Sequence, residues 1–190
     1  MKMWIYFSLL TILFFVSALS GYISAMVNPE NAENMVGQFF TQFEFVKELD
    51  PLKLLTLIFL NNSLKSLIAM LTGFFFGIFP VLFIFLNGYF IGVVVFVKAQ
   101  KIGIFNVLML LLPHGIFEIP AVLMASSYGV WLGGIFYEKV RGENVSIGDA
   151  YRLAFKKFLT RIVPVLLLAA FIETFVTPLV ASSVAGIPKV

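Results

Sequence analysis

The sequence contains no cysteine. This absence excludes disulfide bonds, thiolate metal sites and cysteine nucleophiles. Charged residues are also scarce: they make up 12% of the 190 residues, whereas hydrophobic residues make up 61%. A soluble domain carries about 25% charged residues, and the mean hydropathy here is +1.02. The composition therefore indicates an integral membrane protein with little room for a separate soluble domain.

Motifs of several enzyme classes are missing as well. The sequence has neither HExxH nor GxSxG, and no pair of aspartates in its apolar segments, which argues against an intramembrane protease. It has no nucleotide-binding loop, which excludes an ATPase, and no basic–aromatic cluster of the kind that binds nucleic acid. We therefore expect a non-enzymatic protein that needs no cofactor and binds no nucleic acid.

Long apolar segments dominate what is present. Five of them are long enough to cross a bilayer. These predicted spans are residues 4–26, 52–79, 80–98, 105–137 and 163–184. We expect an all-α multipass bundle that forms one integral membrane domain over residues 1–190. The second and third spans have almost no polar linker between them, which predicts a tight antiparallel helical hairpin.

The first apolar segment has two interpretations. It follows the basic start Met1-Lys2 and ends in small residues, as a secretory signal peptide does. However, its apolar stretch of about twenty residues is long enough to span a membrane, and similar segments follow it. We expect it to be retained as the first helix.

A charged segment follows the first span. Asn28-Pro29-Glu30 is typical of a helix start, with asparagine as the cap and proline at the first helical position. Apolar and acidic residues then alternate at helical spacing over residues 29–49. This segment is too polar to span, so we expect an amphipathic helix that lies along the membrane surface or caps the bundle.

A second amphipathic helix is expected at residues 147–162. Ser146-x-x-Asp149 resembles a capping box at its start. Its apolar residues fall on one face, and a basic group occupies the other. This group is Arg152, Lys156, Lys157 and Arg161. A basic amphipathic helix beside a span is typical of an interfacial helix on anionic cytoplasmic lipid.

The charged loops predict the topology in the cell membrane. Basic residues dominate Glu138–Arg161 and acidic residues dominate Asn28–Asp50. The positive-inside rule places the basic loop and the N-terminus in the cytoplasm, and the acidic loop and the C-terminus outside. This topology requires residues 105–137 to cross once, although a straight helix of that length would be near 50 Å long. Because prolines occur at 113 and 120, we expect this span to be broken at Pro113–Pro120.

An ionisable pair lies in this fourth span. His114 is the only histidine, and Glu118 follows it by four positions, so the two side chains share one helix face. Polar residues occur in other spans too, and all are costly in lipid. The intramembrane polar cluster predicted from the sequence is Asn61, Asn62, Lys65, Asn87, His114, Glu118 and Glu173.

Two roles for this cluster remain open at this stage. It either holds helices together or forms a proton, ion or substrate site, with Lys65 as the natural charge partner of a glutamate. Metal binding is a weaker alternative, because His114 and Glu118 supply too few ligands and only Glu173 is an obvious third. We predict no metal site.

Small residues recur at four-residue spacing in three spans. The predicted helix-packing glycines are Gly73, Gly77, Gly88, Gly92, Gly129 and Gly133. Glycines at this spacing let helix backbones approach closely. They indicate compact packing but leave open which helices pair.

Several of these residues together resemble a known family. Asn61-Asn62-Ser63, Asn87-Gly88 and above all His114-Gly115-x-x-Glu118-x-Pro120-Ala121 are similar to the stage II sporulation protein M family of multipass membrane proteins. The resemblance covers nearly the whole chain. It implies a membrane component of a peptidoglycan-remodelling complex, one that acts with cell-wall hydrolases and is not itself a hydrolase. The family also occurs in bacteria and archaea that make no spores.

The leading interpretation is therefore a scaffold or assembly component of a membrane complex. Its expected partners are the lipid bilayer and other membrane proteins, with a homo-oligomer as a further alternative. The alternative function is a small channel or transporter that uses His114, Glu118 and Lys65. Water access to His114 distinguishes them: a dry, fully paired cluster favours the scaffold, and a hydrated cleft favours the transporter.

Overall fold

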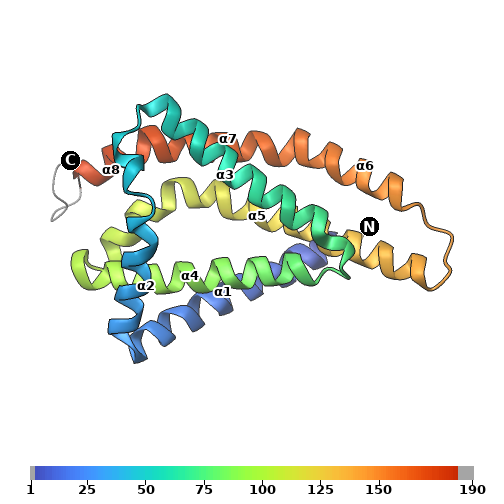
Figure 1. Ribbon diagram of the computed structural model, residues 1–190, viewed down its shortest axis with the longest axis horizontal. Helices are drawn as coiled ribbons and strands as arrows, with labels where there is room; N and C mark the ends of the chain where they lie inside the picture. The colour runs from blue at the N-terminus through green and yellow to red at the C-terminus, as the bar shows by residue number, and fades with distance from the viewer. Residues whose placement is uncertain (1–2, 184–190) are drawn as a thin grey trace.

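The computed structural model describes residues 3–183, and these residues form helices and no strand (Figure 1). Five helical runs are long and apolar enough to cross a membrane. They are α1 (Met3–Val27), α3 (Pro51–Leu71) with its 3₁₀ extension η2 (Thr72–Phe74), α4 (Ile78–Ile102), α5 (Ile104–Val140) and a last run over Ile147–Ser183. The predicted all-α multipass class is confirmed. The basic start Met1-Lys2 and the last residue of the predicted fifth span, Val184, lie outside the described residues.

Helix α1 packs along α4, so the first segment is an integral part of the bundle. The contact is close because small residues line it. A Cβ added to Gly88 of α4 would lie 2.6 Å from the carbonyl oxygen of Phe14. A Cβ added to Gly92 would overlap the carbonyl oxygen of Ala18. Gly21 of α1 meets the backbone of Tyr89 in the same way.

Helices α3 and α4 do not form the predicted tight hairpin. They diverge after a turn in which Gly77 has a φ of 74°, and α5 lies between them (Figure 1). Helix α3 packs on α5 and on the last run, whereas α4 packs mainly on α1. The physical reason lies in the small residues: Gly73 fits against Gly129 of α5, and the glycines of α4 fit against α1.

Helix α5 is continuous over 37 residues, with Pro113 and Pro120 inside it. The expected break at Pro113–Pro120 is therefore wrong. A proline removes one backbone hydrogen bond and crowds the preceding turn, which bends a helix without ending it. The ribbon of α5 changes direction along its length, and its C-terminal end projects beyond the turn between α3 and α4 (Figure 1). These two features accommodate a helix longer than the bilayer core.

The last run contains two π-helical segments. Its elements are α6 (Ile147–Lys157), η3 (Phe158–Ile162), α7 (Val163–Phe171), η4 (Ile172–Val176) and α8 (Thr177–Ser183). Each π segment is followed within two residues by a proline, Pro164 or Pro178. A proline ring clashes with the carbonyl four residues before it, and in both cases that carbonyl belongs to the π segment, so a wider turn relieves the clash.

The predicted surface helix at residues 147–162 is not separate from the last span. Helix α6 begins as predicted, since Ser146 Oγ accepts a 3.3 Å hydrogen bond from the Asp149 backbone N–H. It then continues in line into η3 and α7. Ala154 of α6 and Phe158 and Ile162 of η3 are buried in the core cluster that includes Leu132 of α5. The apolar face thus packs on protein, whereas the sequence had predicted that it would lie on lipid.

Helix α2 (Pro29–Thr41) lies across one end of the bundle (Figure 1). It ends earlier than the predicted residue 49, and a 3₁₀ segment η1 (Glu44–Glu48) follows. Ala32 and Val36 are buried against α1 and α4. Glu33 Oε1 lies 2.6 Å from Lys101 Nζ at the end of α4, and this ion pair holds the pKa of Glu33 below its ordinary value of 4.5. These contacts anchor α2 to the bundle as a cap.

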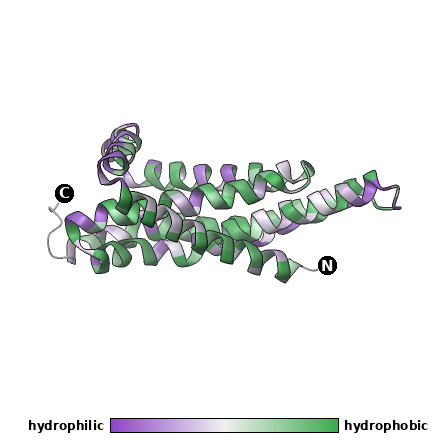
Figure 2. Cartoon of the chain, turned by 90° about the horizontal axis from the view of Figure 1, so that it is seen from below, coloured by the Kyte–Doolittle hydropathy of each residue, from purple (hydrophilic) through white to green (hydrophobic). Residues whose placement is uncertain are grey.

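Polar residues concentrate at the two ends of the molecule (Figure 2). One end carries α2, and the other carries the loop between α5 and α6, as the colours of Figure 2 and the path of Figure 1 show. The acidic and basic loops are thus at opposite ends, which the predicted topology requires. Which end faces the cytoplasm stays a prediction.

Candidate functional site

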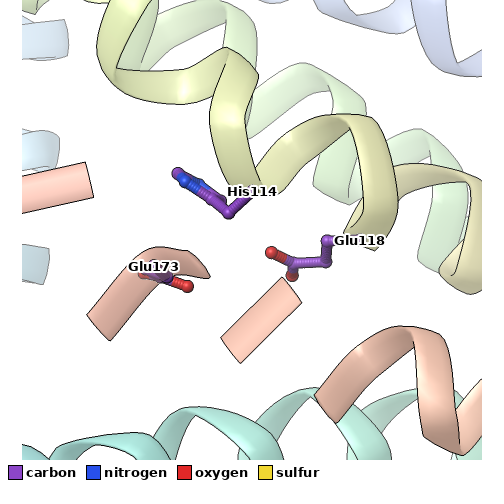
Figure 3. A group of neighbouring side chains, drawn as sticks. All are labelled: His114, Glu118 and Glu173. Carbon is purple, nitrogen blue, oxygen red and sulfur yellow. The ribbon is translucent and has the colours of Figure 1, made fainter. Parts of the chain in front are cut away.

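Three ionisable side chains from two helices meet between α5 and the last helical run (Figure 3). His114 and Glu118 come from one face of α5, and Glu173 comes from η4. One ligand atom of each, a ring nitrogen or a carboxylate oxygen, can be chosen so that all three lie within 4.8 Å of one another. All three side chains are half-buried. The sequence proposed Glu173 as a partner of the pair, and the structure brings it there.

The π segment η4 positions Glu173. A π turn holds an extra residue compared with an α turn, so it changes which side chains face the neighbouring helix, and such turns are frequent at functional sites. Glu173 is the second residue of η4 and faces α5 (Figure 3). The adjoining Thr174 is buried. The wider turn therefore contributes directly to the geometry of the site.

Thr177, at the start of α8, contacts the histidine. Its Oγ1 lies 3.4 Å from His114 Nδ1 and donates a 3.3 Å hydrogen bond to the Ile172 carbonyl oxygen. A hydroxyl has one proton. When that proton is given to the carbonyl, Oγ1 can accept a hydrogen bond from Nδ1–H, and in that tautomer His114 Nε2 keeps its lone pair.

The two carboxylates are close, and they interact unfavourably when both are charged. Glu118 and Glu173 repel each other, and Lys65 of α3 attracts Glu118. Among residues 3–183, Lys65 forms no ion pair within 4.0 Å with either carboxylate, and neither carboxylate accepts a hydrogen bond. The cluster is therefore not the fully paired set that a purely structural role would provide.

A pocket of about 120 Å³ adjoins the site on the side of α1 and α4. Asn87, His114 and Glu118 supply its polar lining, and apolar side chains such as Phe14 and Ile84 supply most of the rest. Asn87 Nδ2 donates a 2.7 Å hydrogen bond to the Phe83 carbonyl oxygen. A cavity of this size has room for a few water molecules beside these three polar side chains.

The polar residues of α3 lie elsewhere. Asn61 and Lys65 are exposed on this helix, and Asn62 is half-buried. Asn61 Nδ2 donates a 3.2 Å hydrogen bond to Asn62 Oδ1. Ser66, on the inner face, is fully buried. Of the predicted intramembrane polar cluster, the structure brings together His114, Glu118 and Glu173, with Asn87 across the pocket, whereas Asn61 and Lys65 are exposed on α3.

Two features escaped the sequence analysis. Thr177 carries no distinctive local signal, because its role depends on the packing of α8 against α5. Ser17, Gly21 and Ala25, by contrast, form a stripe of small residues at four-residue spacing in α1, and all three are buried. That spacing is the known signature of close helix packing, so this stripe was open to prediction.

The comparisons with known proteins agree with this architecture. A family model described as Stage II sporulation protein M matches residues 10–178 of the chain. No curated protein and no solved structure matches the chain significantly. The matched region includes α3, α5 and Glu173, and therefore the whole candidate site.

Proposed function

Because the chain belongs to the stage II sporulation protein M family, we propose that it is a non-enzymatic assembly component of a membrane protein complex. The observation that supports this function most directly is an exposed polar face of α3. This face carries Asn61 and Lys65 in the middle of a predicted span, and both residues are exposed.

Polar groups on such a surface need a partner. Asn61 is the eleventh residue of α3, about 15 Å from its start at 1.5 Å per residue. A charged residue near the centre of a membrane helix costs about 2.5–3.5 kcal/mol in lipid. A helix of another membrane protein that offers hydrogen-bonding or acidic groups would offset this cost. We therefore assign the exposed face around Asn61 and Lys65, here called the α3 face, to a partner protein.

Photo-crosslinking in native membranes tests this assignment. Leu64 lies beside Asn61 on the exposed surface of α3, one helical turn further along, and is 58% exposed. A benzophenone amino acid at position 64 should give a discrete adduct with another membrane protein. The adduct should disappear when Asn61→Leu and Lys65→Leu are introduced together, because the partner then loses its hydrogen-bonding groups.

Ile12 of α1 is the matched control, since it is 61% exposed on an apolar outer surface. The same photoreactive group at position 12 should give lipid adducts and no discrete protein adduct. Protein adducts of equal yield at both positions, or none at position 64, would contradict the proposed role. An adduct of twice the mass of this chain would assign the α3 face to a second copy and would also contradict it.

The pocket beside His114 favours a second candidate function, a small channel or transporter. Transport requires the cluster to exchange protons or ions with water, and the pocket could admit water to His114 and Glu118. In sealed vesicles, Glu118→Gln should then abolish flux and leave the thermal stability unchanged. For an assembly component, the wild-type protein should give no flux above empty vesicles.

A further inference from the structure

We propose that His114, Glu118 and Glu173 bind a divalent transition-metal ion such as Zn²⁺, which links α5 to the last helical run. This inference goes beyond the assembly role and is independent of it, because the α3 face contributes no ligand. It also differs from the expectation drawn from the sequence. The sequence led us to expect no metal site because His114 and Glu118 supply too few ligands. The fold brings the third ligand, Glu173, beside them.

The geometry suits a metal ion. The three ligand atoms lie within 4.8 Å of one another. Bonds of about 2.0–2.2 Å to Zn²⁺ place neighbouring ligand atoms about 3–3.5 Å apart, so side-chain rotations of the order of 1 Å complete the site. Glu118 and Glu173 extend toward each other from opposite helices (Figure 3). One imidazole and two carboxylates form a donor set that suits Zn²⁺ and its neighbours.

Charge supplies the second reason. Two carboxylates at this separation, in a half-buried site between membrane helices, cannot both be charged without compensation. Lys65 acts electrostatically on Glu118, but it is exposed and forms no ion pair there. A dication would neutralise both carboxylates at once, and a neutral His114 would complete an uncharged site.

Thr177 prepares the histidine for this role. Metal-binding histidines commonly donate their second ring N–H to a nearby acceptor, which fixes the tautomer and the ring orientation. Thr177 Oγ1, 3.4 Å from Nδ1, is placed to accept this bond while its own proton goes to the Ile172 carbonyl oxygen. Nε2 is then the ligand nitrogen. The pocket beside His114 and Glu118 has space for a water molecule as a fourth ligand.

The chain offers an unusually clean test. It has one histidine and no cysteine, so no other imidazole and no thiolate of the protein competes for the metal. The purified protein, without a polyhistidine tag, is stripped with a chelator and titrated with Co²⁺ followed by Zn²⁺. We expect one equivalent of Co²⁺, with visible d–d absorption that Zn²⁺ displaces. In the Cu²⁺-loaded protein, pulsed EPR should show the remote nitrogen of a single imidazole.

Variants locate the site. His114→Gln, Glu118→Gln and Glu173→Gln should each weaken Zn²⁺ binding more than tenfold, and Thr177→Val should weaken it about 10–100-fold because His114 Nδ1 loses its contact with the threonine hydroxyl. Glu33→Gln, which removes an exposed carboxylate at the end of the bundle, should leave the affinity unchanged. Size-exclusion profiles verify that each variant is folded.

Three results would overturn the proposal. The first is binding of less than 0.1 equivalent of Co²⁺, Zn²⁺ or Mn²⁺ by the folded wild-type protein, which is about a tenth of full occupancy for one site. This result would overturn the proposal without any measurement on a variant. The second is binding that Glu33→Gln weakens as much as Glu173→Gln does. The third is equal competition by Mg²⁺, which would assign the site to hard cations. None of these results bears on crosslinking at Leu64, so failure here and failure of the proposed function are distinguishable.

Discussion

Glycine packing between α1 and α4 leaves no room for a methyl group. A Cβ added to Gly92 would overlap the carbonyl oxygen of Ala18. Gly92→Ala should therefore push the two helices apart and lower the free energy of unfolding by about 1–3 kcal/mol, the usual cost of overpacking. Thermal unfolding in detergent, followed by circular dichroism, measures this loss.

Gly37→Ala in α2 is the matched control, because no atom lies within 4 Å of the added Cβ. Alanine favours a helix over glycine by about 1 kcal/mol, so this variant should be as stable as the wild type or slightly more stable. Equal stability of Gly92→Ala and Gly37→Ala would show that α1 and α4 are not in close contact.

The ion pair of Glu33 with Lys101 predicts a dependence on pH. Lys101 lowers the pKa of Glu33 below 4.5, so the pair stabilises the docked α2 at pH values above the ordinary carboxyl pKa. This stabilisation is lost as the pH falls through the lowered pKa. The protection factors of the α2 amides, which are exchange rates corrected for their intrinsic dependence on pH, should therefore fall in acid in the wild type and change less in Glu33→Gln. The control Glu30→Gln lies on the same helix and should keep the wild-type response; an identical response in Glu33→Gln would contradict the assignment.

At the scale of residues, the sequence predicted what is local and missed what depends on packing. His114 and Glu118 share a face because four residues separate them on one helix. Glu173 lies 55 positions further on, and its contact depends on how the last run packs on α5 and on the π turn of η4. The charge of Lys65 suggested a direct ion pair with a glutamate. Its side chain is instead exposed on α3 and forms no ion pair within 4.0 Å with either glutamate of the site.

At the scale of elements, the last helical run is the largest departure from the sequence-based expectation. The basic face of residues 147–162 predicted a separate surface helix. In the structure, the opposite face is buried against α5 and the helix continues into the span. Amphipathicity alone does not show whether the apolar face of a helix packs on lipid or on protein. The two prolines widen turns of this helical run without ending it.

Depth measurements by EPR test this continuity. Leu153, Thr160 and Leu167 are exposed and lie seven residues apart, so successive spin labels should differ by about 10 Å along the helix axis. Oxygen accessibility should rise steadily from position 153 to position 167. Equal depths at 153 and 160 would instead place α6 flat on the membrane surface, as the sequence had suggested.

At the scale of the whole molecule, the charged ends predict one topology. Glu44 lies at the α2 end, and Gly142 lies in the loop at the other end. Because the chain has no native cysteine, Glu44→Cys and Gly142→Cys can be labelled singly in intact cells with an impermeant thiol reagent. Position 44 should react from outside, and position 142 only after the membrane is opened. Labelling of both from the same side would rule out five crossings.

The bundle as a whole was largely open to prediction, because apolar segments of spanning length are a strong signal. Which helices pack against one another was not open to prediction. The α3–α4 linker is short, yet each helix finds its small-residue complement elsewhere, at Gly129 or along α1. Sequence spacing shows which faces can approach closely, but only the assembled bundle decides which faces meet.

The most direct test of the assembly role is the mass of the particle that this protein forms in its native membrane. Extraction into native nanodiscs, followed by mass photometry, compares the wild type with the Asn61→Leu, Lys65→Leu double variant. We predict that the wild type is held in a larger particle that contains another membrane protein, and that the double variant is released as a single chain of unchanged thermal stability. Wild-type and variant particles of the same mass would contradict the proposal that the α3 face binds a partner.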